Sequence, residues 1–173
     1  MSAMVVDASV GLALVRREPA EARARAVLVE HVGAPIVAPS IFWLEIINVL
    51  ARRYGYSGAS VLEAVHELDE LQVETIEADR PAFIGVIDLV ERHGLSAYDA
   101  AYLALAETLD AQLATADRQL AVAADGRAVY IGSDPAIAEE RARYRPRKAT
   151  WPLWHDAGAY LAILRASAER SIR

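Results

Sequence analysis

The 173-residue sequence contains no cysteine and no apolar run long enough to cross a bilayer. The absence of cysteine excludes disulfide bonds and metal sites with thiolate ligands. The first fifteen residues are apolar, but they lack a basic leader and contain Asp7, so we expect no signal peptide. These absences fit a cytoplasmic protein that is not associated with a membrane.

Basic residues are outnumbered by acidic ones, which gives a formal net charge of −6, and Lys148 is the only lysine. Proteins that bind nucleic acids are more often basic, because contacts with phosphates dominate their affinity. Two features weaken this objection. If several acids bind a cation together, the cation inverts the local field that a phosphate meets. In addition, residues 141–148 form a basic stretch.

Apolar residues make up 54% of the chain, which is enough to build the core of one domain. Short apolar runs of strand type alternate with longer segments whose apolar residues follow helical spacing. We expect strands at 3–6, 36–38, 73–77, 112–115 and 128–131, and helices at 10–15, 19–31, 40–54, 57–71, 79–93, 96–109 and 118–124. The alternation predicts a three-layer α/β/α fold with a central, mainly parallel sheet. In such sheets the ligand site lies beyond the carboxyl ends of the strands.

Glu45 is the acidic residue that local structure explains least well. It lies well inside the predicted helix 40–54, for which Ser40 is the expected N-cap. This helix is apolar nearly all round, which predicts that it is buried. A buried, unpaired carboxylate is costly. An ion pair with an arginine would explain Glu45, and so would coordination of a divalent cation.

Asp7, Asp99 and Asp117 each stand at the start or end of a predicted element. Each has a local alternative as a helix cap, and Ser96 with Asp99 forms a variant capping box. If these three converge with Glu45, their repulsion raises their pKa values unless a cation is present. Oxygen-only ligands favour Mg²⁺ or Mn²⁺. The chemistry that follows from such a site is hydrolysis of phosphodiester bonds.

Four short motifs in this order resemble those of the PIN-domain family, and specifically of VapC-type toxins. They are Val5-Val6-Asp7-Ala8-Ser9, Trp43-Leu44-Glu45-Ile46-Ile47-Asn48, Leu95-Ser96-Ala97-Tyr98-Asp99-Ala100 and Leu113-Ala114-Thr115-Ala116-Asp117-Arg118. The resemblance covers roughly residues 3 to 132. It implies a PIN-like fold in residues 1–132, with Asp7, Glu45, Asp99 and Asp117 as catalytic and metal-binding acids. Ser9 and Thr115 would be supporting hydroxyl groups, although a helix cap and a strand residue are their plain alternatives.

The resemblance also implies a metal-dependent endoribonuclease that cleaves a tRNA or ribosomal RNA. It implies inhibition by a co-encoded, VapB-like antitoxin, a homodimer, and a larger toxin–antitoxin complex. Two alternatives stay open: a PIN nuclease that acts in RNA maturation, and a decayed PIN-like module that binds RNA or protein. A phosphoacceptor receiver domain fits less well, because it needs paired acids after its first strand and a lysine near its last.

Residues 133–173 extend beyond a typical member of the family, and we expect this extension to be partly helical. Arg145, Arg147 and Lys148, together with Arg118 of the domain, are candidate contacts for RNA phosphates. Trp151 and Trp154 are candidates for stacking on bases. The alternatives are a solvated basic connector with both tryptophans docked on the domain, and a role of the extension in dimer or antitoxin contacts.

Overall fold

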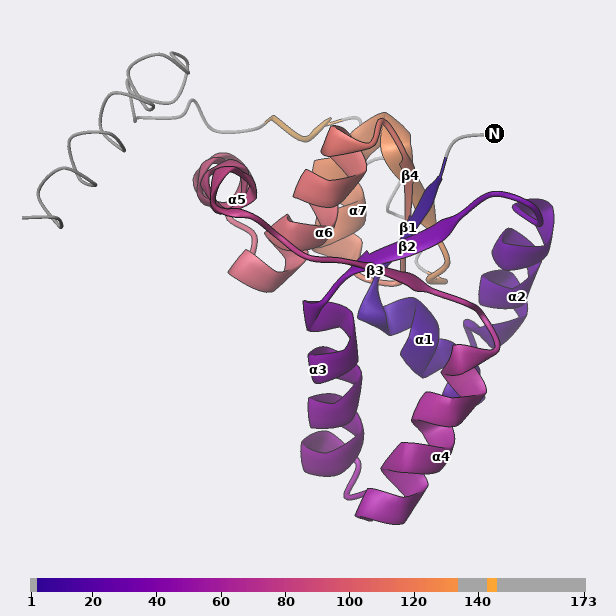
Figure 1. Ribbon diagram of the computed structural model, residues 1–173. Helices are drawn as coiled ribbons and strands as arrows, with labels where there is room; N and C mark the ends of the chain where they lie inside the picture. The colour runs from indigo at the N-terminus through magenta and orange to yellow at the C-terminus, as the bar shows by residue number, and fades with distance from the viewer. Residues whose placement is uncertain (1–2, 134–142, 146–173) are drawn as a thin grey trace, which may run out of the picture.

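The computed structural model describes residues 3–133 and 143–145. Five parallel strands form one sheet in the order β3-β2-β1-β4-β5 (Figure 1). Their bounds are β1 Met4–Val6, β2 Ile36–Pro39, β3 Glu74–Ile76, β4 Gln112–Thr115 and β5 Ala128–Tyr130. All five expected strands are present, and the predicted parallel sheet is confirmed.

The helices cover both faces of this sheet, with α1 to α4 on one side and α5 to α7 on the other (Figure 1). Their bounds are α1 Ala8–Val15, α2 Glu21–Glu30, α3 Ile41–Asn48, α4 Gly58–Asp69, α5 Arg80–His93, α6 Ala97–Thr108 and α7 Arg118–Ala124. The expected three-layer α/β/α architecture is therefore confirmed. In the part of the chain that the structure describes, no helix is both long and apolar enough to cross a membrane.

The chain changes direction at β1. It builds the sheet outward from β1 through β2 to β3, and then returns to add β4 on the other side of β1. In doubly wound sheets this reversal opens a crevice at the carboxyl ends of the two central strands, because the following helices go to opposite faces. Asp7 follows β1 and Asp117 lies just beyond β4, so both residues border this crevice.

Local signals in the sequence set several helix ends. The side chains of Ser57, Asp79 and Ser96 accept hydrogen bonds from backbone N–H groups in the first turns of α4, α5 and α6. Gly94 ends α5 in the left-handed conformation, with a φ of 67°. The predicted cap at Ser40 is wrong, because its side chain makes no such bond and its backbone is already helical.

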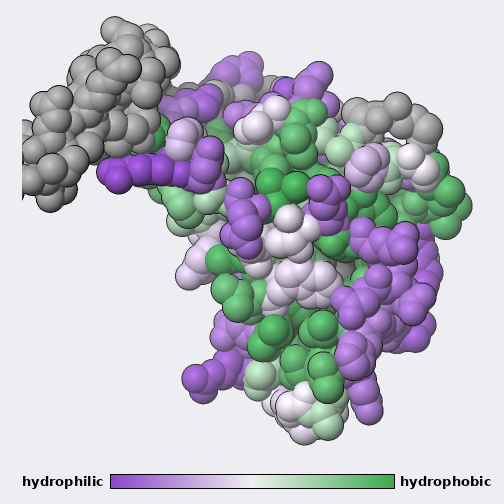
Figure 2. Space-filling view, in the orientation of Figure 1, coloured by the Kyte–Doolittle hydropathy of each residue, from purple (hydrophilic) through white to green (hydrophobic). Residues whose placement is uncertain are grey.

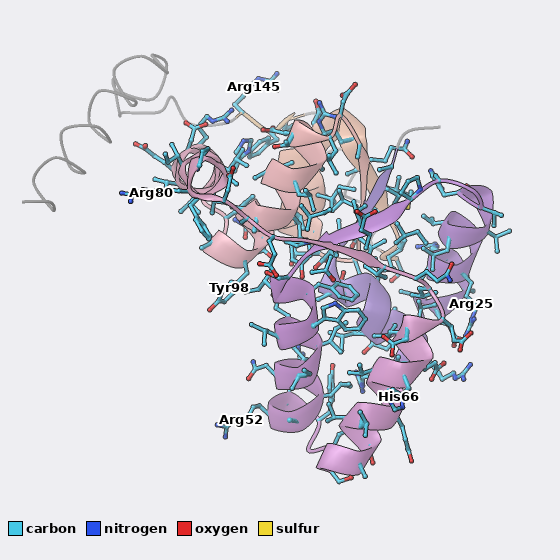
Figure 3. All side chains as sticks on the ribbon, viewed as in Figure 1. Arg25, Arg52, His66, Arg80, Tyr98 and Arg145 are labelled. Atoms are coloured by element: carbon cyan, nitrogen blue, oxygen red, sulfur yellow. The ribbon has the colours of Figure 1, made fainter. Side chains whose placement is uncertain are left out.

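Two helices differ from their predicted form. Helix α2 begins at Glu21, so Pro19 lies before the helix. The segment predicted as one helix from 40 to 54 is α-helical only to Asn48, and Val49–Arg53 continues it as a π-helical turn. Arg52, at the far end of this turn, projects into solvent (Figure 3).

The core on the α1–α4 side is tightly packed where α1 meets α3 and α4. A Cβ atom on Gly11 would lie 2.9 Å from Ile46 Cδ1, 3.2 Å from Phe42 Cζ and 3.4 Å from Leu68 Cδ1. Glycine therefore lets α1 approach these side chains closely. The close approach fixes α3, and with it Glu45, relative to the helix that follows Asp7.

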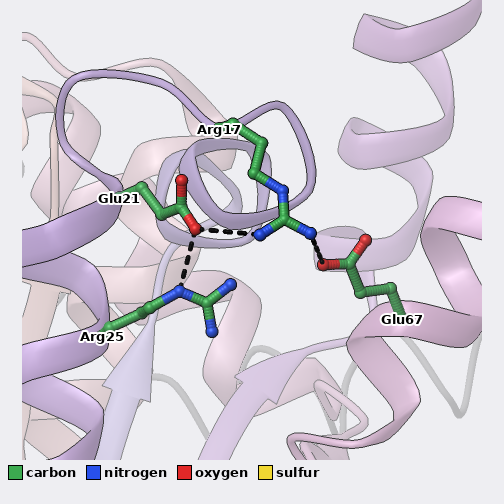
Figure 4. Close-up of polar contacts among 4 residues, drawn as sticks. All are labelled: Arg17, Glu21, Arg25 and Glu67. Atoms are coloured by element: carbon green, nitrogen blue, oxygen red, sulfur yellow. Dashed lines mark hydrogen bonds and ion pairs between the residues drawn. The ribbon is translucent and has the colours of Figure 1, made fainter.

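Ion pairs at the surface join α2 and α4 through Arg17, which precedes α2 (Figure 4). Arg17 contacts Glu21 Oε1 at 3.2 Å and Glu67 Oε1 at 3.3 Å, while Arg25 Nε donates to Glu21 Oε1 at 2.9 Å. The hydrogen bond from Arg25 and the charge of Arg17 lower the pKa of Glu21. These charges satisfy one another and contribute little to stability at the surface.

Candidate active site

Asp7 is a buried carboxylate at the end of β1. It occupies the N-cap position of α1, but its side chain forms no standard capping hydrogen bond, so capping alone does not explain this residue. Instead, Ser9 Oγ and Thr115 Oγ1 both donate to Asp7 Oδ2, each at 2.6 Å. Burial raises the pKa of Asp7, and the negative charge of Asp99 adds to the rise, whereas the two hydroxyl groups oppose it.

The two hydroxyl groups also fasten the ends of the central strands together. Thr115 is completely buried, and its Oγ1 accepts a hydrogen bond from the Asp117 backbone N–H at 2.9 Å. Ser9 Oγ accepts from the Ala116 N–H at 2.8 Å. Each hydroxyl therefore donates to the carboxylate and accepts from the β4–α7 turn, which fixes Asp7 relative to Asp117.

Glu45 is half-buried on α3, and the prediction that this helix is buried all round is wrong. Leu44 is 65% exposed and Ile47 is 42% exposed, so hydrophobic side chains reach the surface over α3 (Figure 2). The helix packs only one face, with Phe42 and Ile46, into the core. Sequence alone did not distinguish a buried helix from one with an apolar outer face.

The partner of Glu45 is a tyrosine. Within the described residues Glu45 forms no ion pair with an arginine, and the Tyr102 hydroxyl donates a hydrogen bond to Glu45 Oε2. Burial raises the pKa of Glu45 to about 7; the hydrogen bond from Tyr102 opposes this rise, and the charges of Asp7 and Asp99 add to it. Burial and the negative charges of Asp7 and Glu45 also raise the pKa of Tyr102.

Sequence reasoning missed Tyr102. It lies three residues after Asp99, on the same side of α6, and it is completely buried. A tyrosine in an otherwise apolar, buried helix face signals a hydroxyl group that needs a partner. That partner is 57 residues away along the chain, so only the fold reveals it.

Asp99 and Asp117 both take part in helix caps, which was the local alternative for each of them in the sequence. Ser96 Oγ donates to Asp99 Oδ2 at 2.7 Å and accepts from the Asp99 N–H at 3.1 Å. Asp117 Oδ1 accepts from the Leu120 N–H at 2.7 Å. Burial raises the pKa of Asp99, and the negative charge of Asp117 adds to that rise. Capping occupies one oxygen of each carboxylate, so it does not exclude a second role.

Known proteins share this architecture, and the family model for the PIN domain matches residues 4–126. The chain belongs to the PIN-domain family. A comparison with curated proteins finds no match.

Solved structures share the fold of this PIN domain at low sequence identity. A toxin–antitoxin complex from Klebsiella pneumoniae has a TM-score of 0.58 and 18% identity, over 75% of this chain and 98% of that chain. VapC20 of Mycobacterium tuberculosis, a toxin that cleaves the sarcin–ricin loop, has a TM-score of 0.58 and 16% identity, over 70% and 95%. FitAcB from Neisseria gonorrhoeae has a TM-score of 0.55 and 19% identity, over 74% and 97%. These similarities support the fold.

The donor set of the PIN domain fits a hard divalent cation. Asp7, Glu45, Asp99 and Asp117 offer only oxygen atoms, and burial together with negative neighbours raises the pKa of the first three. Among residues 3–133 and 143–145, no three acidic or histidine side chains are grouped so that they hold one ion together. An ion at this place would therefore be held by one or two carboxylates and by water, an arrangement that is common for Mg²⁺.

The candidate RNA contacts lie in different parts of the chain. Arg118 is exposed in the first turn of α7, directly after Asp117. Arg145 is exposed and projects away from the domain (Figure 3). Arg147 and Lys148 lie outside the described residues, as does most of the predicted extension. Arg118 is thus the described cation that is nearest in sequence to a candidate active-site acid.

Proposed function

We propose that this PIN domain is a Mg²⁺- or Mn²⁺-dependent endoribonuclease and the toxin of a toxin–antitoxin pair. One observation carries the nuclease part: beyond the ends of β1 and β4, the charge of Asp99 adds to the raised pKa values of Asp7 and Glu45, and the charge of Asp117 adds to that of Asp99. In the described part of the chain, none of the four forms an ion pair with an arginine or lysine. Uncompensated acids at this position of a doubly wound sheet favour a site for cations.

The residues of the site have distinct roles in this proposal. Asp7 and Glu45 would hold the ion most directly, since Ser9 and Thr115 fix one oxygen of Asp7 and Tyr102 fixes one oxygen of Glu45. Asp99 and Asp117 would complete the site with their remaining oxygens or through water. When bound, the cation would polarise the scissile phosphate and stabilise the charge that develops during hydrolysis. Without a cation the pKa of Glu45 is about 7, and a bound cation would favour the carboxylate form that holds it.

The proposed RNA substrate and toxin role are supported by structures that share the fold and by residues at the surface. Structures that share the fold include a toxin–antitoxin complex and a toxin that cleaves the sarcin–ricin loop. Arg118 directly follows Asp117, and we propose it as a contact for an RNA phosphate. Exposed apolar side chains on α3 and α5, such as Leu44 and Phe83, support protein partners, which we propose to be a second copy and an antitoxin.

The test combines cell growth with direct cleavage. Induced expression of the wild type in a bacterial host should stop growth, and sequencing of RNA 5′ ends should reveal new, site-specific cuts in tRNA or ribosomal RNA. Purified protein should make the same cuts in isolated RNA with Mg²⁺ or Mn²⁺, and excess EDTA should abolish them. Asp7→Asn should be inactive in both assays.

Asp69→Asn is the matched control, because Asp69 is an exposed acid at the end of α4, on a helix that carries none of the four acids. It should behave like the wild type. Cuts that persist in Asp7→Asn or in EDTA would contradict the proposed mechanism. Normal growth with an unchanged RNA population would contradict the toxin role.

A further inference from the structure

The hydrogen bond between Tyr102 and Glu45 joins the two helical layers that lie on opposite faces of the sheet. Tyr102 belongs to α6, which packs on β1 and β2 from one side, whereas Glu45 belongs to α3 on the other side (Figure 1). The two residues therefore meet beyond the carboxyl ends of the strands, where Asp7 also lies. Their contact spans the crevice in which we place the ion.

The hydroxyl of Tyr102 is held between two partners. The side chain is completely buried, so its hydroxyl needs partners. Glu45 accepts the hydrogen bond that it donates, and the backbone of Ala8 also forms a hydrogen bond with it. The bond takes up Oε2 of Glu45, and the described residues provide no hydrogen bond to Oε1. Without this bond, a half-buried glutamate has several side-chain rotamers to explore.

We propose that Tyr102 is a positioning residue that holds Glu45 with one oxygen directed at the divalent cation. The inference rests on the proposed function, because it presupposes that Glu45 faces an ion. Ligands of metal ions are commonly oriented by hydrogen bonds from residues behind them, and loss of such a bond weakens metal binding by about 10- to 100-fold. Tyr102 occupies that place behind Glu45, just as Ser9 and Thr115 do behind Asp7.

The first experiment measures Mn²⁺ binding to the full chain by electron paramagnetic resonance of the free ion. Tyr102→Phe should weaken Mn²⁺ binding by about 10-fold or more, while circular dichroism shows an intact fold. Tyr54→Phe is the matched control. The ring of Tyr54 packs against Arg16, with the guanidinium carbon 3.1 Å from the ring centroid, and Phe keeps this contact. Its Mn²⁺ affinity should equal that of the wild type.

A double-mutant cycle then separates an effect through Glu45 from a general loosening of the structure. In the Glu45→Gln background, Tyr102→Phe should cause little further loss of Mn²⁺ affinity, because the carboxylate that it orients is gone. Equal losses in both backgrounds would overturn the inference. Unchanged or tighter Mn²⁺ binding by Tyr102→Phe alone would also overturn it.

A measurement on the wild type avoids dependence on the stability of the variants. With ¹³C-labelled tyrosine, addition of Mg²⁺ should shift the ring signals of Tyr102 and leave those of Tyr54 in place. Absence of a Tyr102 shift in a protein that binds Mn²⁺ would overturn the positioning role and leave the nuclease proposal standing. Absence of Mn²⁺ binding by the wild type would overturn both.

Discussion

The ionisation of Glu45 should make the metal-free protein less stable in weak base than in weak acid. Burial and the charges of Asp7 and Asp99 raise the pKa of Glu45 from 4.5 to about 7 in the folded state. The folded protein therefore binds this proton more tightly than the unfolded chain does. Its free energy of unfolding should rise as the pH falls through 7, and the gain is complete below about 4.5.

The size of this effect follows from the pKa difference. Each unit of difference between the folded and unfolded pKa corresponds to about 1.4 kcal/mol, so the rise from 4.5 to about 7 for Glu45 sets an upper limit of about 3.5 kcal/mol. Because Glu45 is only half-buried, screening by solvent reduces the expected effect to about 1–2 kcal/mol. Glu45→Gln removes the charge but keeps an oxygen that can accept the Tyr102 hydrogen bond. The variant should therefore be more stable than the wild type by about this amount at pH 8, and nearly equal to it at pH 5.

Urea unfolding in EDTA at pH 5 and pH 8 measures the difference. Comparison with the variant cancels the contributions of other acids, such as Glu21, whose lowered pKa acts in the opposite direction. Glu63→Gln, an exposed change on α4, should leave the pH dependence of the wild type unchanged. Parallel pH profiles for the wild type and Glu45→Gln would refute the reasoning, and would mean that the Glu45 carboxylate is well solvated.

Three further changes separate packing from chemistry. Gly11→Ala should destabilise the protein by about 1–3 kcal/mol in thermal unfolding, because its Cβ would lie 2.9 Å from Ile46 Cδ1. Gly85→Ala, in α5, has open space around the new Cβ and should instead stabilise the protein by up to about 1 kcal/mol. The same change in stability for both variants would contradict the close packing at Gly11. Asp117→Ser keeps a cap for α7 but loses the carboxylate. RNA cleavage should therefore fall, while the melting temperature stays within a few degrees of that of the wild type. Full activity of this variant would assign Asp117 to capping alone. Thr115→Val should lower the free energy of unfolding by about 1–3 kcal/mol and reduce cleavage, because it removes the hydrogen bond to Asp7 and leaves the Asp117 N–H without its acceptor. Thr115→Ser should keep most of the stability and most of the activity. A Val variant as active as the wild type would argue against a role for the hydroxyl.

The sequence predicts the fold well because the relevant signals are local. Apolar runs mark most of the strands, although β3 contains Glu74 and Thr75, and residues such as Asp79 and Gly94 mark helix ends that the structure reproduces. The order of strands and helices then restricts the topology, since parallel strands need crossovers of consistent hand. The π-helical turn at Val49–Arg53 is different, because nothing in its residues distinguishes it from a continued α-helix.

The site is only partly predictable because its contacts are distant along the chain. The motifs around Asp7 and Asp117 indicate that two strand ends carry acids, but not that Thr115 donates to one residue and accepts from the other. Apolar neighbours of Glu45 predict burial, yet they also fit a helix whose outer face remains exposed. The Glu45–Tyr102 contact depends on how α3 and α6 approach each other, which no local pattern records.

The order of strands in the sheet has a consequence for synthesis on the ribosome. β4 contributes the Thr115 hydroxyl and leads into Asp117, and it pairs with β1, which was made more than a hundred residues earlier. A nascent chain that stops before β4 holds Asp7, Glu45 and Asp99 but has no strand to close the crevice. Any activity that depends on the four carboxylates therefore begins only after nearly the whole domain has left the exit tunnel, so fragments from interrupted translation should be harmless to the cell that makes them.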